Sequence, residues 1–183
     1  MYSRSSEPIR FDRDAEVVMV PSGERVNMPA GSIGYITQAL GGSYTLFIEG
    51  NMFRLHGVDA DAIGKEPVPP IEMPADATDE QVEQMVWQQL RTCFDPEIPV
   101  NIVELGLVYK VEMSRTESGE RKVSVDMTLT APACGMGEIL IDDVRSKVEM
   151  IPTVAECDVE LVFDPPWNRT MMSELAKLET GMM

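Results

Sequence analysis

A proline-rich segment divides this chain of 183 residues into two parts with different patterns. Residues 64–77 carry four prolines and few large apolar side chains. Prolines at this density favour an extended chain over helix or sheet, so the segment predicts a semi-rigid linker. We therefore expect one domain over residues 1–63 and a second over residues 78–183.

The part before the linker is a series of short strand-like runs separated by glycine-containing turns. The runs are Glu16–Pro21, Arg25–Met28, Ile33–Leu40, Ser43–Glu49 and Met52–Val58. Short strands at this spacing are typical of a small barrel or sandwich. About 60 residues give a thin hydrophobic core. We therefore predict a small β-rich, barrel-like domain that leans on the second domain or on another subunit.

The part after the linker alternates helical and strand patterns. Thr78-Asp79-Glu80-Gln81 has the form of a capping box and predicts a helix that begins at Thr78 and ends before Pro96. The later elements are expected to be strands Leu105–Met113 and Val123–Thr130, helix Gly137–Met150, strand Val154–Phe163 and a short helix Met171–Glu179. The first two strands predict an antiparallel hairpin, and the strand–helix–strand unit predicts a right-handed parallel crossover.

These patterns predict an α+β protein. A small N-terminal all-β domain is followed by a C-terminal α-β-β-α-β-α domain with a small mixed three-stranded sheet.

The net charge of the chain limits the classes of molecule that it can bind. The chain holds 31 Asp and Glu against 15 Lys and Arg, a formal charge of −16. Such a surface repels phosphate, so nucleic acid and anionic membranes are excluded as partners. Solubility is the first explanation of the acidic surface, and docking to a basic protein is the second. Apolar runs are far shorter than the roughly 20 residues that span a bilayer.

The N-terminus and the cysteine count point to the cytoplasm. Residues 1–8 lack the apolar stretch of a secretory signal. Three cysteines, an odd number, argue against a disulfide framework and suit a reducing compartment. Cys93 and Cys157 fall on apolar faces of a helix and a strand, which predicts that both are structural.

Cys134 differs from the other two thiols. It lies in the loop Thr130-Ala131-Pro132-Ala133-Cys134-Gly135-Met136-Gly137, directly before a predicted helix. Helix N-termini stabilise thiolates and offer free N–H groups to anions, and the flanking glycines let a ligand approach the backbone. Cys134 is therefore expected to be a nucleophile or a metal ligand.

For each of these two roles, the sequence lacks residues that usually accompany such a cysteine. A cysteine nucleophile most often needs a histidine base, and the only histidine, His56, falls in the first domain. A closed zinc or [4Fe–4S] site needs about four ligands, which one loop cysteine cannot supply. A bound cluster would have to be shared between subunits, passed between partners, or completed by carboxylates or a small thiol.

Two further motifs combine rigidity with polar or aromatic groups. Asp95-Pro96-Glu97-Ile98-Pro99-Val100-Asn101-Ile102 places two carboxylates around a proline, and Asp164-Pro165-Pro166-Trp167 follows the last strand. The simplest interpretations are a solvated rigid turn and a tryptophan that caps the sheet edge. The closely spaced prolines also pre-organise whatever the carboxylates face.

Three ordered motifs over residues 78–180 resemble the metal–sulfur cluster assembly domain family. Residues 95–108 are similar to its DPE-x-P-V…DLGLV signature, with Glu104 where the family usually has aspartate. Residues 130–134 are similar to its T-x-P-x-C loop. Asp164–Trp167 with Met172 and Ser173 is similar to its D-P-P-W…M-S ending. The N-terminal β segment resembles the long, SufT-type form.

The resemblance implies a factor, rather than an enzyme, that carries or targets iron–sulfur clusters to apo-proteins. By position, Cys134 would be the metal ligand, and Asp95, Glu97 and Thr130 would line the same cofactor-binding pocket. The implied partners are iron–sulfur scaffold proteins and apo-targets, with a transient cluster that a homodimer could share. Two alternatives stay open: a metal-free adaptor that docks apo-enzymes, and a thiol-dependent enzyme.

Overall fold

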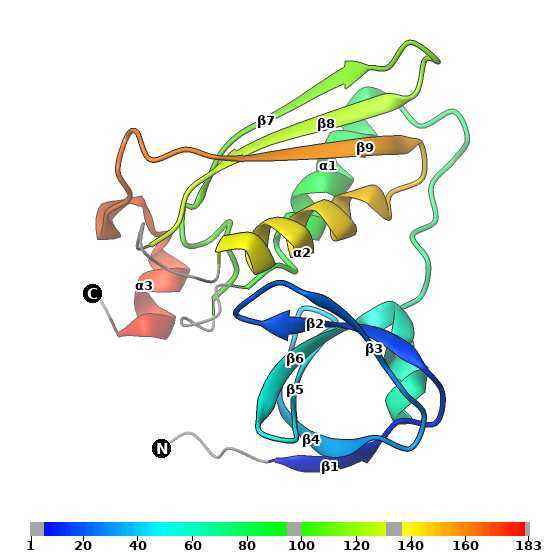
Figure 1. Cartoon of the computed structure of the whole chain (residues 1–183). Helices are drawn as coiled ribbons and strands as arrows, with labels where there is room; N and C mark the ends of the chain where they lie inside the picture. Colours follow the sequence, from blue (N-terminus) through cyan, green and yellow to red (C-terminus); the bar gives the residue numbers. More distant parts are fainter. Residues whose placement is uncertain (1–5, 95–99, 131–136, 182–183) are drawn as a thin grey trace. The chain divides into compact units, whose positions relative to one another are not determined.

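The computed structural model describes residues 6–94, 100–130 and 137–181. The chain forms two compact units, unit 1 (residues 1–70) and unit 2 (residues 71–183) (Figure 1). No helix among the described residues is long and apolar enough to cross a membrane.

Unit 1 is a six-stranded antiparallel sheet in the order β1-β4-β5-β6-β2-β3. The elements are β1 (Glu7–Arg10), β2 (Ala15–Val20), β3 (Arg25–Met28), β4 (Ile33–Leu40), β5 (Ser43–Ile48), β6 (Asn51–His56) and the 3₁₀ helix η1 (Gly57–Ile63). The sheet curls around a core in which Phe11, Leu46 and Leu55 are fully buried (Figure 1). The strands expected from the sequence are present, and β1 is an additional one.

Unit 2 contains α1 (Asp79–Leu90), β7 (Val108–Arg115), β8 (Arg121–Met127), α2 (Gly137–Glu149), β9 (Val154–Leu161), η2 (Arg169–Met171) and α3 (Glu174–Thr180). Its sheet has the order β7-β8-β9, with β7 antiparallel and β9 parallel to β8. The predicted mixed three-stranded sheet and the parallel crossover through α2 are therefore confirmed. In Figure 1, α1 and α2 lie on one side of this sheet.

The capping box forms as the sequence predicts. The Gln81 backbone N–H donates to Thr78 Oγ1 at 3.2 Å, and the Thr78 N–H donates to Gln81 Oε1 at 2.9 Å. Val82, Val86 and Leu90 form the buried stripe of α1 and pack into one core with the inward side chains of β8 and α2.

Helix α1 is shorter than predicted, since it ends at Leu90 rather than before Pro96. Cys93 and Phe94 continue the apolar spacing but leave the helix. The Cys93 carbonyl accepts from the Ile102 N–H at 2.9 Å, and Phe94 forms a bridge with Asn101. Pairing with a later segment thus replaces the last turn of the predicted helix.

Two other expectations need correction. Phe163, predicted to face the core, is 45% exposed because β9 ends at Leu161, before this residue reaches the sheet. Residues 64–77 do not form a separate linker throughout. The Val68 N–H donates to the Gly57 carbonyl within unit 1, whereas Ala77 is buried in the core of unit 2.

Candidate functional site

The described parts of the first and third sequence motifs meet the small sheet at one end, here called the carboxyl edge. Strands β8 and β9 are parallel and finish together, with Met127 paired to Leu161, and β7 begins opposite Met127 at Val108. Residues 131–136, which include Cys134, connect β8 to α2 and lie outside the described residues. The ends of parallel strands are common binding positions in mixed sheets.

The described part of the first motif is a compact turn that leads into β7. Asn101 Oδ1 accepts the backbone N–H groups of Val103 at 3.1 Å and Glu104 at 3.0 Å. The Leu107 N–H donates to the Ile102 carbonyl, and the Leu107 carbonyl accepts from the Thr128 N–H at 2.8 Å. The last contact fastens the turn to the end of β8.

The third motif packs directly on this turn. Trp167 Nε1 donates to the Leu105 carbonyl at 2.7 Å, and the Ser173 N–H donates to the Glu104 carbonyl at 2.8 Å. The Tyr109 hydroxyl donates to the Pro165 carbonyl at 2.7 Å. Residues more than 55 positions apart in the chain are therefore joined by three hydrogen bonds at the carboxyl edge.

Gly106 makes the close approach of the two motifs possible. Its φ of +75° is strained for residues with a side chain, and a Cβ atom here would lie 2.3 Å from the Met171 carbonyl oxygen. Only glycine meets both conditions without moving the backbone of the third motif.

The structure describes one of the four predicted site residues. Thr130 is half-buried, three residues after the end of β8. Asp95, Glu97 and Cys134 lie outside the described residues. The segment that carries Asp95 and Glu97 is flanked by the Phe94–Asn101 bridge, and the segment that carries Cys134 is flanked by Thr130 and Gly137.

Sequence reasoning did not assign roles to Asn101, Gly106 and Tyr109. Asn101 carried a usable signal, because an asparagine side chain often accepts backbone N–H groups two or three residues later. Gly106 also carried one, since an isolated glycine before a strand often marks a special φ or a close approach. Nothing local distinguished Tyr109 from other strand residues.

The other two cysteines are buried, as the sequence predicted. Cys93 has no exposed surface, and its Sγ lies 3.6 Å from the Gln89 carbonyl oxygen. Cys157 is 1% exposed, and burial, reinforced by the nearby Glu149 carboxylate, raises its pKa to about 12. Cys157 is therefore a neutral thiol at physiological pH and a poor nucleophile or ligand.

The described residues contain no cluster of three or more His, Cys, Asp or Glu side chains that could hold a metal ion. His56 lies at the end of β6 in unit 1 and is half-buried.

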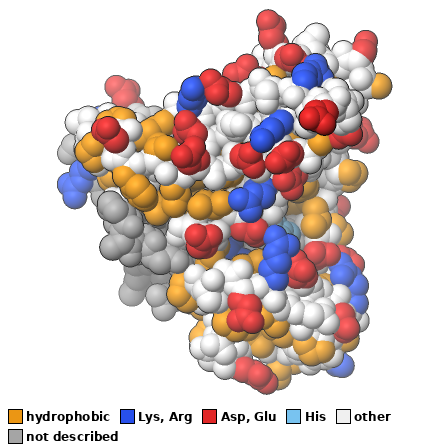
Figure 2. Space-filling model, turned by 45° about the horizontal axis from the view of Figure 1, so that its top comes forward, with side chains coloured by type: hydrophobic (Ala, Val, Ile, Leu, Met, Phe, Trp, Pro, Cys, Tyr) orange, Lys and Arg blue, Asp and Glu red, His pale blue; other side chains and the backbone are white. Residues whose placement is uncertain are grey.

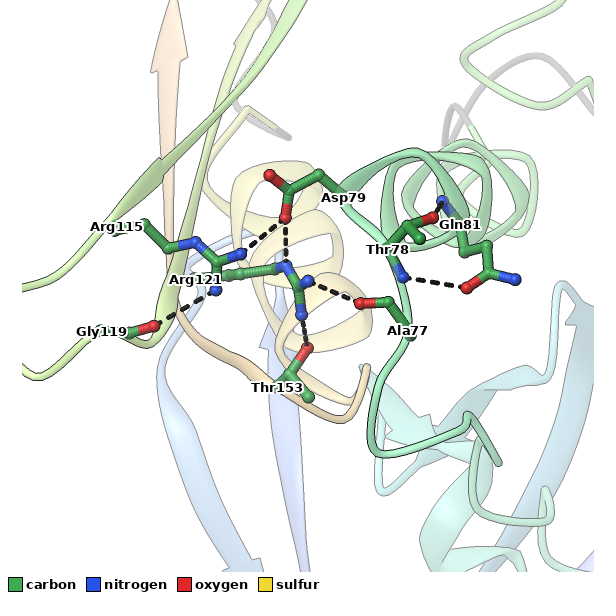
Figure 3. A network of polar contacts seen from close by, with 8 residues as sticks. All are labelled: Ala77, Thr78, Asp79, Gln81, Arg115, Gly119, Arg121 and Thr153. Carbon is green, nitrogen blue, oxygen red and sulfur yellow. Dashed lines mark hydrogen bonds and ion pairs between the residues drawn. The ribbon is translucent and has the colours of Figure 1, made fainter.

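The opposite end of the small sheet, here called the amino edge, is organised around Arg121 (Figure 3). The side chain of Arg121 is 8% exposed, and its Nε donates to Asp79 Oδ1 at 2.8 Å. Its Nη1 donates to Thr153 Oγ1 at 2.6 Å and its Nη2 to the Ala77 carbonyl at 2.8 Å. Asp79 also accepts from Arg115, and the Arg121 hydrogen bond holds the pKa of Asp79 below its ordinary value.

Comparison with known proteins places unit 2 in a family. The family described as "Iron-sulfur cluster assembly protein" matches residues 83–161. The Fe-S protein maturation auxiliary factor of Porphyromonas gingivalis is 46% identical over 103 residues, which are 56% of this chain and 94% of that protein. The Staphylococcus aureus protein named Fe-S protein maturation auxiliary factor SufT is 43% identical over 88 residues, 48% of this chain and 96% of that protein.

A solved structure agrees with these relatives. The crystal structure of a domain of unknown function, DUF59, from Bacillus anthracis aligns with a TM-score of 0.50 at 34% identity. The alignment covers 57% of this chain and 95% of that domain. Two relatives above 40% identity are thus matched over nearly their whole length. This chain therefore belongs to the iron–sulfur cluster assembly protein family, among its SufT-type members.

Proposed function

We propose that this protein matures iron–sulfur proteins by carrying or targeting clusters to apo-proteins through the Cys134 thiol. The relatives' names support the maturation role. The observation that carries the proposal is the meeting of the first and third motifs at the carboxyl edge, where the chain that includes Cys134 joins β8 to α2. The backbone contacts between these two motifs would give the thiol a fixed setting.

The cluster is cargo in this proposal and is held only while it is transferred. Cys134 precedes α2, a helix of 13 residues whose first N–H groups favour thiolate over thiol. A thiolate is the form that binds iron. Asp95 and Glu97 would supply further oxygen donors. One thiolate leaves most of the coordination to the donor or acceptor protein, so the cluster can leave readily.

The protein is proposed to act in the cytoplasm as a factor and not as an enzyme. Its one histidine, His56, belongs to unit 1, and the described part of unit 2 offers no other imidazole that could activate a thiol. This distribution of residues supports coordination by Cys134 over nucleophilic attack.

Anaerobic reconstitution with iron and sulfide tests the role of Cys134. We expect wild-type protein to retain iron and sulfide after desalting, with visible absorption, and Cys134→Ser to lose both. The matched control is Cys157→Ala, which removes a buried thiol from the same unit and should leave the iron content unchanged. Equal iron in wild type and Cys134→Ser, or no iron in either, would refute the carrier function.

The open face of the small sheet favours a second candidate, a metal-free adaptor that docks basic proteins. This face is opposite the buried Val123, Val125 and Met127. Its outward side chains are Lys110, Glu112, Ser114, Lys122, Ser124, Asp126, Glu156, Asp158 and Glu160. Acidic and basic side chains are interspersed over the part of unit 2 visible in Figure 2. A polar, mainly acidic face of this kind suits a basic partner.

Anaerobic affinity capture separates the two functions. The adaptor predicts that Cys134→Ser recovers the same iron–sulfur proteins as wild type, and that Glu156→Lys with Asp158→Lys loses them. The carrier predicts that the Cys134→Ser variant fails to activate an apo-protein even where it still binds it.

A further inference from the structure

An apolar row crosses the outer face of unit 1. Residues paired directly across neighbouring strands point to the same face of a sheet. Pro8 pairs with Tyr35, Tyr35 with Phe47, and Phe47 with Met52. Met52 in turn pairs with Val20, so the row runs over β1, β4, β5, β6 and β2.

This row is not part of the core of unit 1. Tyr35 is 49% exposed, Phe47 43% and Met52 41%. The residues that alternate with them along the strands, Ile36 and Leu46, are buried on the inner side. Single exposed apolar residues are ordinary, but a contiguous group marks an interaction surface.

A groove on this face shares Pro8, Tyr35 and Phe47 with the row and also brings in charged side chains. It has a volume of about 740 Å³, and its lining includes Arg10, Ile33 and Glu49. Arg10 pairs with Ile33 across β1 and β4. Glu49 directly follows β5, which neighbours β4 on the side away from β1, and lies in the turn to β6 with a φ of +48°. The order across the strands is therefore positive, apolar, negative.

That order is self-complementary. A two-fold axis reverses the order of the strands in a second copy. The series Arg10, Ile33 and Glu49 of one copy therefore lies against the same three residues of the other copy in the opposite order. Arg10 then faces the partner subunit's Glu49, and the apolar rows of the two copies pack together. Among the ion pairs of the described residues, neither Arg10 nor Glu49 takes part in one, so both charges are available.

The distribution of charge also favours unit 1 as the place where two copies meet. Residues 1–70 hold 6 Lys and Arg against 9 Asp and Glu, a net charge of −3. Residues 71–183 hold 9 against 22, a net charge of −13. Two copies of an acidic chain repel least through the part that is nearly neutral.

We propose that the outer face of β1, β4 and β5 is a two-fold interface between two copies of this chain. The interface is centred on Tyr35, Phe47 and Ile33, and is bordered by two Arg10–Glu49 ion pairs between the copies. The proposal rests on unit 1 alone and is independent of cluster binding.

Sedimentation equilibrium of the full-length metal-free protein tests the interface. Wild type should be a dimer at high concentration, and Phe47→Ser should weaken the dimer by at least about tenfold in Kd. Val58→Ser is the matched control, because Val58 is 44% exposed but outside the row, and this variant should dimerise as wild type does. Circular dichroism confirms that each variant is folded.

Charge reversal identifies the residues that face each other. Arg10→Glu and Glu49→Arg should each weaken the dimer by about tenfold, because each places two pairs of like charges in contact. An equimolar mixture of the two variants should recover dimer, since both contacts between unlike copies are then attractive. The double variant R10E/E49R should also recover it.

A wild-type monomer at every concentration would overturn the proposal. So would a dimer that is insensitive to Phe47→Ser, or a failure of the mixture to recover affinity. A cover formed by unit 2 of the same chain, or by another protein, would give one of these results.

Discussion

The two edges of the small sheet are held together by different kinds of contact. At the amino edge, one buried guanidinium joins α1, β8 and the start of β9 through side-chain charge. At the carboxyl edge, backbone carbonyls of the first motif accept from Trp167, Ser173 and Thr128, and a glycine allows the close approach. The first edge depends on the side chain of Arg121, whereas the second depends on backbone geometry. This contrast suggests that the amino edge serves as a fixed scaffold and that the carboxyl edge forms the candidate site.

The largest effect is expected from Gly106→Ala at the carboxyl edge. The new Cβ atom would clash with the Met171 carbonyl, and alanine is strained at φ +75°. Together these should lower the free energy of unfolding by roughly 3–5 kcal/mol, measured by denaturant titration. Gly119→Ala is the control, because Gly119 has φ +83° but nothing within 4 Å of the added atom. It should cost only about 1–2 kcal/mol, and an equal cost at both glycines would exclude the clash.

Arg121→Met should have the next largest effect, because it removes the side chain that joins the elements of the amino edge. It removes a buried charge together with hydrogen bonds to Asp79, Thr153 and Ala77. We expect a loss of about 2–4 kcal/mol in denaturant unfolding. Arg115→Met removes an arginine that also contacts Asp79 but is 51% exposed, and should change stability by less than about 1 kcal/mol. Similar losses for both arginines would contradict the central role of Arg121.

Trp167→Phe should weaken the carboxyl edge slightly. The ring still packs, but the hydrogen bond to the Leu105 carbonyl is lost. The expected cost is about 1 kcal/mol, and amide hydrogen exchange should speed up near Glu104 and Ser173 without a change near Arg121. Faster exchange at both edges would show that they unfold as one unit.

The last and smallest predicted effect is the change in stability with pH that arises from Asp79. Its pKa is lowered from 3.8, chiefly by the Arg121 hydrogen bond, so its carboxylate stabilises the fold above this value. That contribution is lost as the pH falls through the folded-state pKa. Wild type should therefore lose stability more steeply than Asp79→Asn on acidification from about pH 5 to pH 2, measured by thermal unfolding. If the stability of wild type and of Asp79→Asn fell in parallel with pH, the link between the Asp79 pKa and stability would be contradicted. The control is Glu80→Gln, in the same helical turn.

Local signals were enough to predict much of the fold. The capping box depends on Thr78 and Gln81, three residues apart, and the sequence contains all that it needs. The alternation of Val123, Val125 and Met127 likewise defined which face of β8 is buried. The end of α1 was not predictable in this way, because Phe94 leaves the helix to pair with Asn101.

The sequence was enough to find the motifs of the candidate site, but not the contacts between them. Trp167 and Leu105 are 62 positions apart, and their hydrogen bond exists only after β7, β8 and β9 have assembled. The Arg121 network was missed entirely, because Asp79 and Thr153 carry no local sign that one arginine will join them. The roles of Asp95, Glu97 and Cys134 stay predictions, with reconstitution as their test.

The bridge between Phe94 and Asn101 joins the two ends of the stretch that carries Asp95 and Glu97. Both ends are pinned by backbone contacts, since the Ile102 N–H donates to the Cys93 carbonyl just outside the bridge. Conservative substitutions of Asp95 and Glu97 are therefore expected to leave the core side chains on either side in place. Asp95→Asn and Glu97→Gln can therefore be compared with wild type in the same anaerobic reconstitution, and a loss of iron would be assigned to the carboxylates and not to the fold.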